Sequence, residues 1–156
     1  MANETLRVGL IGAGGNTRSR HIPGLKAQPD VSIDIVANRS VDSGQKVADE
    51  FGISRVAETW TDVIADEAID AVCIGTWPYM HAPMTIAALD AGKHVLCEAR
   101  MALNSGEARD MLAASRRNPT RIAQIVTAPH TLKFDRTIAE MVGAGAIGDL
   151  IALDAR

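Results

Sequence analysis

The stretch LRVGLIGAGGNT, residues 6–17, decides how this chain is expected to fold. Val8, Leu10 and Ile11 form a short apolar run that predicts a buried strand of a parallel sheet. Glycines at positions 12, 14 and 15 follow this run, and the polar residues after them can open a helix. A strand that ends in a glycine turn and leads into a helix is typical of the first unit of an α/β fold.

The glycine spacing favours a turn that binds a dinucleotide. Gly12 allows the tight turn, and Gly14 lets the main chain approach a pyrophosphate closely. The N–H groups of the following helix then point at that pyrophosphate, helped by the helix dipole. Thr17 stands where the third small residue of the pattern belongs, and an ordinary glycine turn is the alternative. A second strand pattern about twenty residues on favours the nucleotide-binding interpretation.

Length and composition predict one domain with an aliphatic core. The chain has 156 residues, which is enough for a real core. It contains two Trp, one Tyr and two Phe, so Val, Ile, Leu, Ala and Met must fill that core. Cys73 and Cys97 each lie in an apolar run, and a place in the strand core is favoured over a disulfide or a reactive thiol.

Charge and hydropathy exclude several classes of protein. A formal net charge of −3 gives no basic field for nucleic acid. No segment approaches the ~18 apolar residues of a membrane span, and the first residues lack the pattern of a signal peptide. We therefore expect a cytoplasmic protein with neither a nucleic-acid nor a membrane partner.

Strand and helix patterns alternate along the chain. After the first strand, further strands are expected at residues 31–37, 53–57, 71–74, 94–97 and 122–127. The helix after residue 17 is broken by Pro23 and Gly24. Later helices are expected from Ser40 to Gly52, from a cap at Thr61 or Asp62, over residues 81–91, and from Asn104 or Ser105 to about residue 117. This alternation predicts a doubly wound parallel sheet, the Rossmann architecture, with right-handed crossovers.

The end of the chain has a different pattern. Residues 134–142 predict an amphipathic helix, and residues 147–154 predict a strand that is just beginning. A terminal strand without a partner is a poor way to finish a domain, so a second domain or another chain is expected to supply the partner. We therefore divide the chain into a dinucleotide-binding domain, 1–127, and the start of a truncated second α/β domain, 128–156.

Polar residues follow the strands where such sheets bind their ligands, beyond the carboxyl ends. Asn38 stands where a carboxylate would hold an adenosine ribose 2′-hydroxyl, and Arg39 lies beside it. Arg pairs a phosphate with two charge-assisted hydrogen bonds, and Ser40 adds a hydroxyl. This favours NADP(H) over NAD(H), which stays possible. The alternative is that Arg39 is only solvated.

The remaining candidates leave alternatives open. Residues 76–79 predict a ledge beside the adenosine or ribose of the cofactor, although packing under a loop explains Trp77 equally well. Capping or packing is favoured for His81 over catalysis. His21 and His130 have no Cys or carboxylate at metal-ligand spacing, so no metal site is expected.

Several stretches resemble the glucose-fructose oxidoreductase / inositol dehydrogenase / MocA (Gfo/Idh/MocA) family. They are GAGG at 12–15, ANR at 37–39, HAPM at 81–84, AAL at 87–89, AGKHVLCE at 91–98 and GAIGD at 145–149. The resemblance implies an NAD(P)-binding Rossmann domain, then a domain that carries most of the substrate site and of a homo-oligomer interface. It also implies reversible hydride transfer at a sugar or polyol carbon.

The resemblance also implies the cofactor contacts. Residues around the pyrophosphate would be Gly12, Gly14, Gly15, Asn16 and Thr17. The adenosine ribose end would be held by Asn38, Arg39 and Ser40, and the cofactor would be lined by Thr76, Trp77, Pro78 and His81. Glu98 would lie near the nicotinamide ribose.

Two departures leave the catalytic residues unknown. The Glu-Lys-Pro of the family is Glu98-Ala99-Arg100 here, and Arg100 stays charged, so it is a poor acid or base. The family's acid–base Asp and His belong to the second domain. Together with the preference for NADP(H) read from Arg39, the resemblance implies the cofactor domain of an NADP(H)-dependent sugar or polyol oxidoreductase. The alternatives are a dinucleotide-binding sensor without turnover and an enzyme that uses a tightly held NAD transiently.

Overall fold

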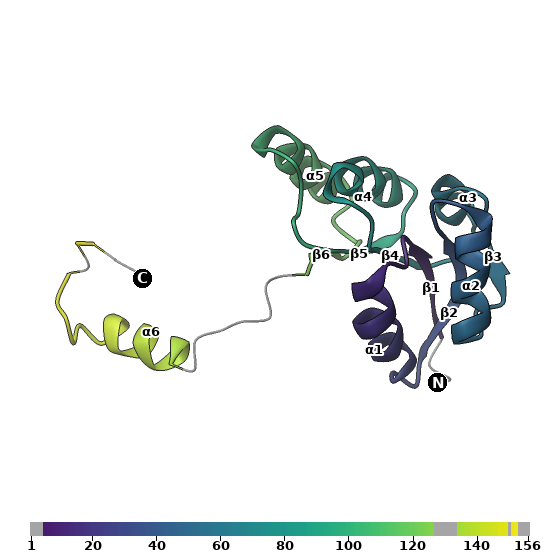
Figure 1. Ribbon diagram of the computed structural model, residues 1–156. Coiled ribbons are helices and arrows are strands. Elements are labelled where there is room, and N and C mark those ends of the chain that lie inside the picture. The colour runs from purple at the N-terminus through teal and green to yellow at the C-terminus, as the bar shows by residue number, and fades with distance from the viewer. Residues whose placement is uncertain (1–4, 127–133, 150, 153–156) are drawn as a thin grey trace.

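The computed structural model describes residues 5–126, 134–149, 151 and 152, which contain one parallel sheet (Figure 1). Its strand order is β3-β2-β1-β4-β5-β6. The strands are β1 (Leu6–Ile11), β2 (Val31–Ala37), β3 (Arg55–Val56), β4 (Ala71–Ile74), β5 (His94–Cys97) and β6 (Ala123–Ile125). The order reverses between β1 and β4, so the crevice for a ligand is expected beyond the carboxyl ends of these two strands.

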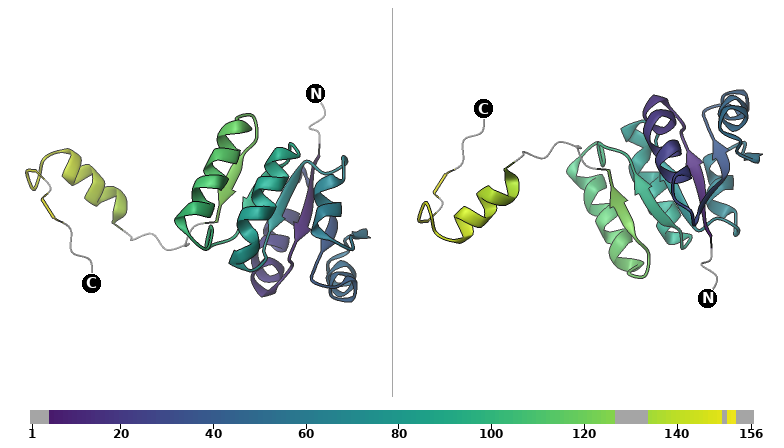
Figure 2. Two further views of the ribbon diagram at one scale, coloured as in Figure 1. Left: turned by 90° about the horizontal axis from the view of Figure 1, so that it is seen from above. Right: turned by 90° about the horizontal axis from the view of Figure 1, so that it is seen from below.

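Helices cover both faces of this sheet (Figure 2). On one face α1 (Ile22–Lys26) and α2 (Val41–Phe51) pack, and on the other α3 (Trp60–Ala65), α4 (His81–Asp90) and α5 (Ser105–Arg117) pack. Two short segments, η1 (Thr17–His21) and η2 (Pro78–Met80), precede α1 and α4. The predicted doubly wound α/β fold is confirmed.

Aliphatic side chains fill both layers between sheet and helices. Leu10 and Cys73 lie in the core beneath α1 and α2, and Ile74, Cys97 and Leu89 lie in the core beneath α3, α4 and α5. Because strands of a parallel sheet bury both faces, they read as nearly continuous apolar runs, as the sequence of β1 and β4 does. The expected burial of both cysteines is confirmed.

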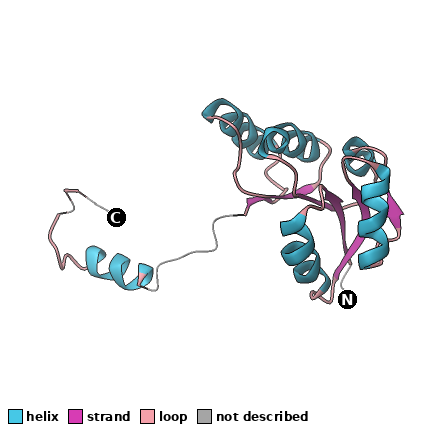
Figure 3. Cartoon of the chain, in the orientation of Figure 1, coloured by secondary structure: helices cyan, strands magenta, loops and turns pink. Residues whose placement is uncertain are grey.

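Figure 3 shows the helices and the loops that join them, and the local sequence explains where two of these helices begin or end. The Ser40 side chain caps α2, and Gly52 ends it in a left-handed conformation with a φ of 64°. The predicted cap of α3 is wrong, because Thr59 rather than Thr61 or Asp62 takes that place. Thr59 caps the helix because the Thr59 backbone N–H donates a hydrogen bond to the Asp62 carboxylate, which completes a capping box.

The C-terminal part contains α6 (Asp135–Gly143), which confirms the predicted amphipathic helix. Figure 1 shows α6 apart from the sheet and its helices. The strand predicted at residues 147–154 is wrong for the described part, because residues 147–149, 151 and 152 form turns and irregular structure. A strand needs a partner for its hydrogen bonds, and the six-stranded sheet ends at β6. The predicted boundary at residue 127 lies outside the described residues, as does His130.

The described residues contain neither a membrane-spanning helix nor a cluster of metal ligands. Within the described ranges, no helix has both the length and the apolar character needed to cross a bilayer. The same residues contain no group of three or more His, Cys, Asp or Glu side chains arranged to hold a metal ion.

Candidate functional site

The glycine loop after β1 has the backbone that its sequence predicts. Gly12 has a φ of 84°, and a Cβ there would lie 2.6 Å from Thr76 Cγ2 and 2.9 Å from the Thr76 backbone nitrogen. Only glycine therefore fits at this position. At Gly14 and Gly15 the space is open, because an added Cβ would meet nothing within 4 Å. These two exposed residues present bare backbone to a ligand.

Thr17 occupies the place of the third small residue because Gly75 makes room for it. Thr17 is 1% exposed, and its hydroxyl donates to the Gly12 carbonyl at 3.1 Å. A Cβ at Gly75 would lie 2.0 Å from Thr17 Oγ1 and 2.5 Å from the Gly12 oxygen. In the usual pattern, a third glycine in the helix allows the helix to pack closely against the strand. Here Gly75, at the end of β4, allows this close packing instead. Thr17 thus supports the loop from beneath.

The end of β2 presents two exposed residues and one inward-facing residue. Asn38 is half-buried, and both polar groups of its side chain bond to the main chain of neighbouring segments. Ser40 is exposed, and its hydroxyl accepts from the Ser43 backbone N–H at 3.3 Å as the cap of α2. Arg39 is exposed and has no hydrogen bond or ion pair to the residues that the structure describes. Its guanidinium is therefore available to a phosphate.

The loop after β4 places Trp77 in solvent and His81 in the interior. Trp77 is 72% exposed, so the alternative that it packs under a loop is wrong. Thr76 and Pro78 are half-buried beside it. His81 has no exposed surface, and its Nδ1 and Nε2 lie 2.7 Å and 3.0 Å from the Arg100 and Thr76 carbonyl oxygens. His81 therefore joins the loops after β4 and β5, and packing accounts for it as expected.

The end of β5 holds Glu98 against the first helical turn. The Asn16 side chain donates to Glu98 Oε1, and His21 Nε2 bonds to the same oxygen. The Ala99 backbone N–H donates to the other carboxylate oxygen at 3.0 Å. Burial by itself raises the pKa of Glu98, but the hydrogen bonds from His21, Ala99 and Asn16, with the His21 charge, outweigh it and lower that pKa. Glu98 is thus an anion held close to the glycine loop.

The pairing of His21 with Glu98 is a feature that the sequence analysis missed. The two residues are 77 positions apart, and each side chain is 13% exposed. No local pattern connects them, since only the sheet order brings the end of β5 to the helix that follows β1.

Among the residues that the structure describes at this edge, no nucleophile or general acid stands out. Burial raises the pKa of the Cys73 thiol to about 12 and that of Cys97 to about 11, so both stay protonated and unreactive. Ala99 has no functional side chain, and Arg100 is exposed. The arrangement can bind an anionic, nucleotide-like ligand through main-chain N–H groups and Arg39.

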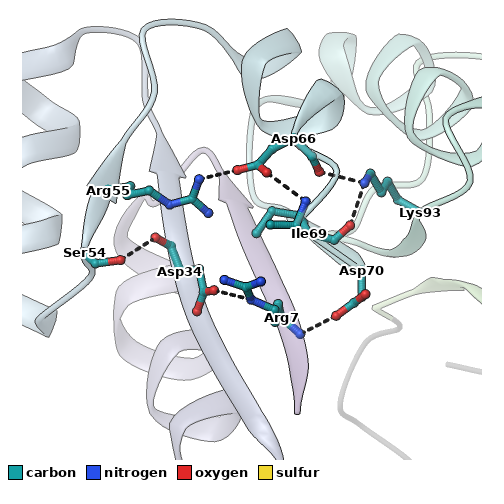
Figure 4. Close-up of polar contacts among 9 residues, drawn as sticks. Arg7, Asp34, Ser54, Arg55, Asp66, Ile69, Asp70 and Lys93 are labelled. Atoms are coloured by element: carbon teal, nitrogen blue, oxygen red, sulfur yellow. Dashed lines mark hydrogen bonds and ion pairs between the residues drawn. The ribbon is translucent and has the colours of Figure 1, made fainter. Parts of the chain in front are cut away.

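The opposite edge of the sheet, where the strands begin, has a different character (Figure 4). Lys93 is 8% exposed, and its Nζ donates to the backbone oxygens of Asp66 and Ile69 at 2.8 Å and 2.6 Å. Arg55 pairs with the Asp66 carboxylate, and Arg7 Nε lies 2.7 Å from an Asp34 carboxylate oxygen. These three cationic side chains bond within the protein, so they hold the elements of this edge together.

Comparisons with known proteins agree with this geometry. A family model described as "Oxidoreductase family, NAD-binding Rossmann fold" (GFO_IDH_MocA) matches residues 6–125. The chain is 32% identical over 152 residues to dTDP-3,4-didehydro-2,6-dideoxy-alpha-D-glucose 3-reductase of Streptomyces violaceoruber, covering 97% of this chain and 44% of the relative. It is 31% identical over 150 residues to inositol 2-dehydrogenase 3 of Saccharopolyspora erythraea, covering 92% and 42%.

A solved structure extends the likeness to three dimensions. A 3-ketoreductase from Actinomadura kijaniata, in complex with TDP-benzene and NADP, superposes with a TM-score of 0.78 at 27% identity. The superposition covers 94% of this chain and 46% of the ketoreductase. The chain therefore spans less than half the length of the relatives that it matches.

Proposed function

Because the chain belongs to the Gfo/Idh/MocA family of oxidoreductases with an NAD-binding Rossmann fold, we propose that it binds NADP(H) at the carboxyl edge of its sheet. The observation that carries the proposal is the loop after β1. Gly12 has a φ of 84° that forms the turn, and the space above Gly14 and Gly15 is open. A Cβ at Gly12 would collide with Thr76 and Gly75, so glycine is needed for the turn, and the open space at Gly14 and Gly15 fits a diphosphate.

The diphosphate would lie over the start of the first helix. The first N–H groups of a helix have no partner within it, and the hydrogen bond from Arg18 to the Gly14 carbonyl, 2.9 Å long, is the first of this one. The N–H groups of residues 14–17 would therefore face the diphosphate oxygens. Asn16 would add its side-chain amide, while Thr17 supports the loop through its bond to the Gly12 carbonyl.

Arg39 supports NADP(H) rather than NAD(H) as the preferred cofactor. Its exposed guanidinium has no partner in the described part of the chain and stands at the carboxyl end of β2. An additional phosphate on the adenosine ribose would pair with it through two parallel hydrogen bonds. Ser40 would contribute its backbone and hydroxyl at the same end. NAD(H) would bind at the same place but more weakly.

The nicotinamide supplies the hydride chemistry when the cofactor is bound. This chain would orient it with the loops after β4 and β5. Trp77, Thr76 and Pro78 would form one wall, His81 would hold both loops from beneath, and Glu98 would lie near the nicotinamide ribose. Ala99 offers no group for proton transfer, so we assign no catalytic residue to this chain.

The substrate and partners are proposals for the whole protein, since its relatives are more than twice as long. Sugar reduction in one named relative and inositol oxidation in another support a sugar or polyol as the substrate.

We further propose that residues 1–127 are the cofactor domain and that residues 128–156 begin a second domain. The whole protein would be a cytoplasmic homo-oligomer without a nucleic-acid partner. The net charge of −3 on the present chain supports only the last of these points. The named relatives lend no support to the alternative of a sensor without turnover.

Calorimetric titration of the purified chain with NADPH and with NADH tests this function. We expect binding of both, with NADPH preferred by about ten-fold because of the phosphate pair. Arg39→Ala should remove the preference by weakening NADPH alone. Arg116→Ala, which removes the same charge from the exposed last turn of α5, is the matched control. Absence of binding to either dinucleotide would overturn the proposal.

A further inference from the structure

The side chain of Asn38 is turned into the protein at the end of β2. Its Oδ1 accepts a hydrogen bond from the Ala13 backbone N–H at 2.7 Å, and its Nδ2 donates to the Ser43 carbonyl at 3.1 Å. Each half of the amide thus has a main-chain partner. An amide is the side chain that can accept and donate in fixed directions from one short stem.

These two partners belong to different loops of the candidate site. Ala13 lies between Gly12 and Gly14 in the glycine loop, and Ser43 lies in the first turn of α2, where it completes the capping box with Ser40. A single side chain therefore joins the loop for the diphosphate to the loop that carries Arg39. One backbone bond, from the Gly12 N–H to the Ala37 carbonyl at 2.8 Å, runs beside it.

A carboxylate at this position would not do the same work. Aspartate could still accept from the Ala13 N–H, but it would turn an acceptor toward the Ser43 carbonyl oxygen, where Asn38 now donates. Two acceptors that face each other repel, and the Ser43 carbonyl would lose the hydrogen bond from the residue 38 side chain. The inward direction also means that residue 38 does not project beyond β2 toward a ribose.

We propose that Asn38 is a positioning residue that sets the glycine loop relative to the Arg39–Ser40 loop and does not itself contact the cofactor. The proposal rests on the proposed function, since it names how that site is held. It separates two tasks at the end of β2. Asn38 fixes the geometry that every adenine dinucleotide needs, and Arg39 decides between NADP(H) and NAD(H).

Calorimetric titrations of NADP⁺ and NAD⁺ with three variants test the division. Asn38→Ala should lower the affinities for NADP⁺ and NAD⁺ by the same factor, about ten-fold for two lost hydrogen bonds. The ratio of the two affinities should therefore stay within about two-fold of the wild-type ratio, which is on the order of the error of such titrations. Asn38→Asp should likewise weaken both, whereas Arg39→Ala should weaken NADP⁺ alone. A gain in NAD⁺ affinity for Asn38→Asp would show that residue 38 reaches the ribose and would overturn the proposal. So would an Asn38→Ala variant that binds both dinucleotides like the wild type.

Hydrogen exchange gives a readout that does not depend on the cofactor. In the full chain, Asn38→Ala should speed exchange of the Ala13 amide and leave the core amides of β4 protected, because only the tie between loops is lost. Unchanged exchange at Ala13 would overturn the positioning role. If the wild type binds neither dinucleotide, the proposed function fails on its own, and the exchange measurement still decides whether Asn38 joins the loops. A variant that unfolds is replaced by Asn38→Ser, which keeps a short acceptor.

Discussion

The two edges of the sheet are held together by different forces. Where the strands begin, charged groups are paired: Lys93 is almost buried on two carbonyl oxygens, and Arg7 and Arg55 pair with carboxylates. Where the strands end, glycines and main-chain bonds set the geometry, and Arg39 has no partner in the described residues. Both edges consist of loops between the same strands and helices, so the contrast does not come from topology.

The difference shows how this fold separates stability from binding. At the first edge, the ammonium of Lys93 and the guanidinium groups of Arg7 and Arg55 are used in contacts within the protein. At the second edge, open backbone and an unpaired guanidinium keep hydrogen-bonding capacity that folding does not use. The contrast predicts that substitutions at the first edge change the free energy of unfolding, while those at the second change affinity for a dinucleotide.

The largest expected effect is at Lys93. Lys93→Met keeps most of the buried stem but removes the ammonium that donates to the backbone oxygens of Asp66 and Ile69. The Asp66 oxygen keeps its hydrogen bond from the Ile69 N–H, whereas the buried Ile69 oxygen loses its donor, so we expect a loss of about 3 kcal/mol in the free energy of unfolding for the two charge-assisted bonds together. Urea denaturation measures it, and Lys46→Met on the exposed face of α2 is the control. A loss under about 1 kcal/mol would mean that the ammonium is not part of the framework.

Gly75→Ala should connect the two kinds of effect. The new Cβ would lie 2.0 Å from Thr17 Oγ1 and 2.5 Å from the Gly12 oxygen, so the glycine loop must shift. Overpacking of this kind costs about 2 kcal/mol of stability, and dinucleotide affinity should fall with it. Adding Thr17→Ala should restore stability only in part, because the contact with the Gly12 backbone remains. Thermal unfolding and calorimetry measure the two effects.

Gly24→Ala in α1 is the matched control for this substitution. An added Cβ there meets nothing within 4 Å, so the variant should be as stable as the wild type or more stable. Equal losses for Gly24→Ala and Gly75→Ala would show that the fit between Gly75 and Thr17 does not matter.

The parts of the fold that depend on local patterns could be predicted from the sequence. The boundaries expected for β2 and β4 agree with the structure because apolar runs and nearby turn residues define them. The turn at Gly12 was predictable for the same reason. The cap of α3 at Thr59 was missed because Thr59, Thr61 and Asp62 are all good caps, and the choice depends on the capping box.

Contacts between distant segments could not be predicted. The sequence identified Asn38 and Glu98 as site residues, but their partners lie 25 and 77 positions away, at Ala13 and His21. Whether Asn38 faces a ligand or the protein depends on the distance between two loops, which no pattern contains. Lys93 lies in the motif AGKHVLCE at residues 91–98, but the motif does not indicate what its ammonium group binds. That depends on the loop before β4, whose backbone oxygens at Asp66 and Ile69 accept its hydrogen bonds.

A smaller effect concerns acid stability at the first edge. The backbone hydrogen bond from Ala68 lowers the pKa of Asp66 below its ordinary value of 3.8, with help from Arg55 and Lys93. A carboxyl whose pKa is lower when folded stabilises the protein above its unfolded pKa, and this contribution is lost as the pH falls through the folded pKa. Asp66→Asn should therefore be less stable than the wild type by under about 1 kcal/mol near pH 6. The gap should close as the pH falls below about 4.

Urea denaturation across that pH range measures the gap. Asp110→Asn, on the exposed face of α5, serves as the control and should show a gap that is smaller throughout. A gap for Asp66→Asn that widens with falling pH would have the wrong sign for a carboxylate stabilised in its ionised form.

The smallest expected change in stability, at Gly14, sharpens the contrast most. A Cβ at Gly14 meets nothing within 4 Å, and its φ lies outside the range that strains other residues, so Gly14→Ala should alter the free energy of unfolding by less than about 0.5 kcal/mol. The same methyl group would stand between the loop and a diphosphate, and affinity for NADPH should fall about ten-fold. Gly143→Ala in α6, which also meets nothing within 4 Å, is the control and should change neither quantity. If Gly14→Ala bound NADPH like the wild type, the diphosphate could not lie against this loop, because a methyl group at residue 14 would occupy part of the space that the diphosphate needs. The open space at the second edge would then not be a binding site for the diphosphate.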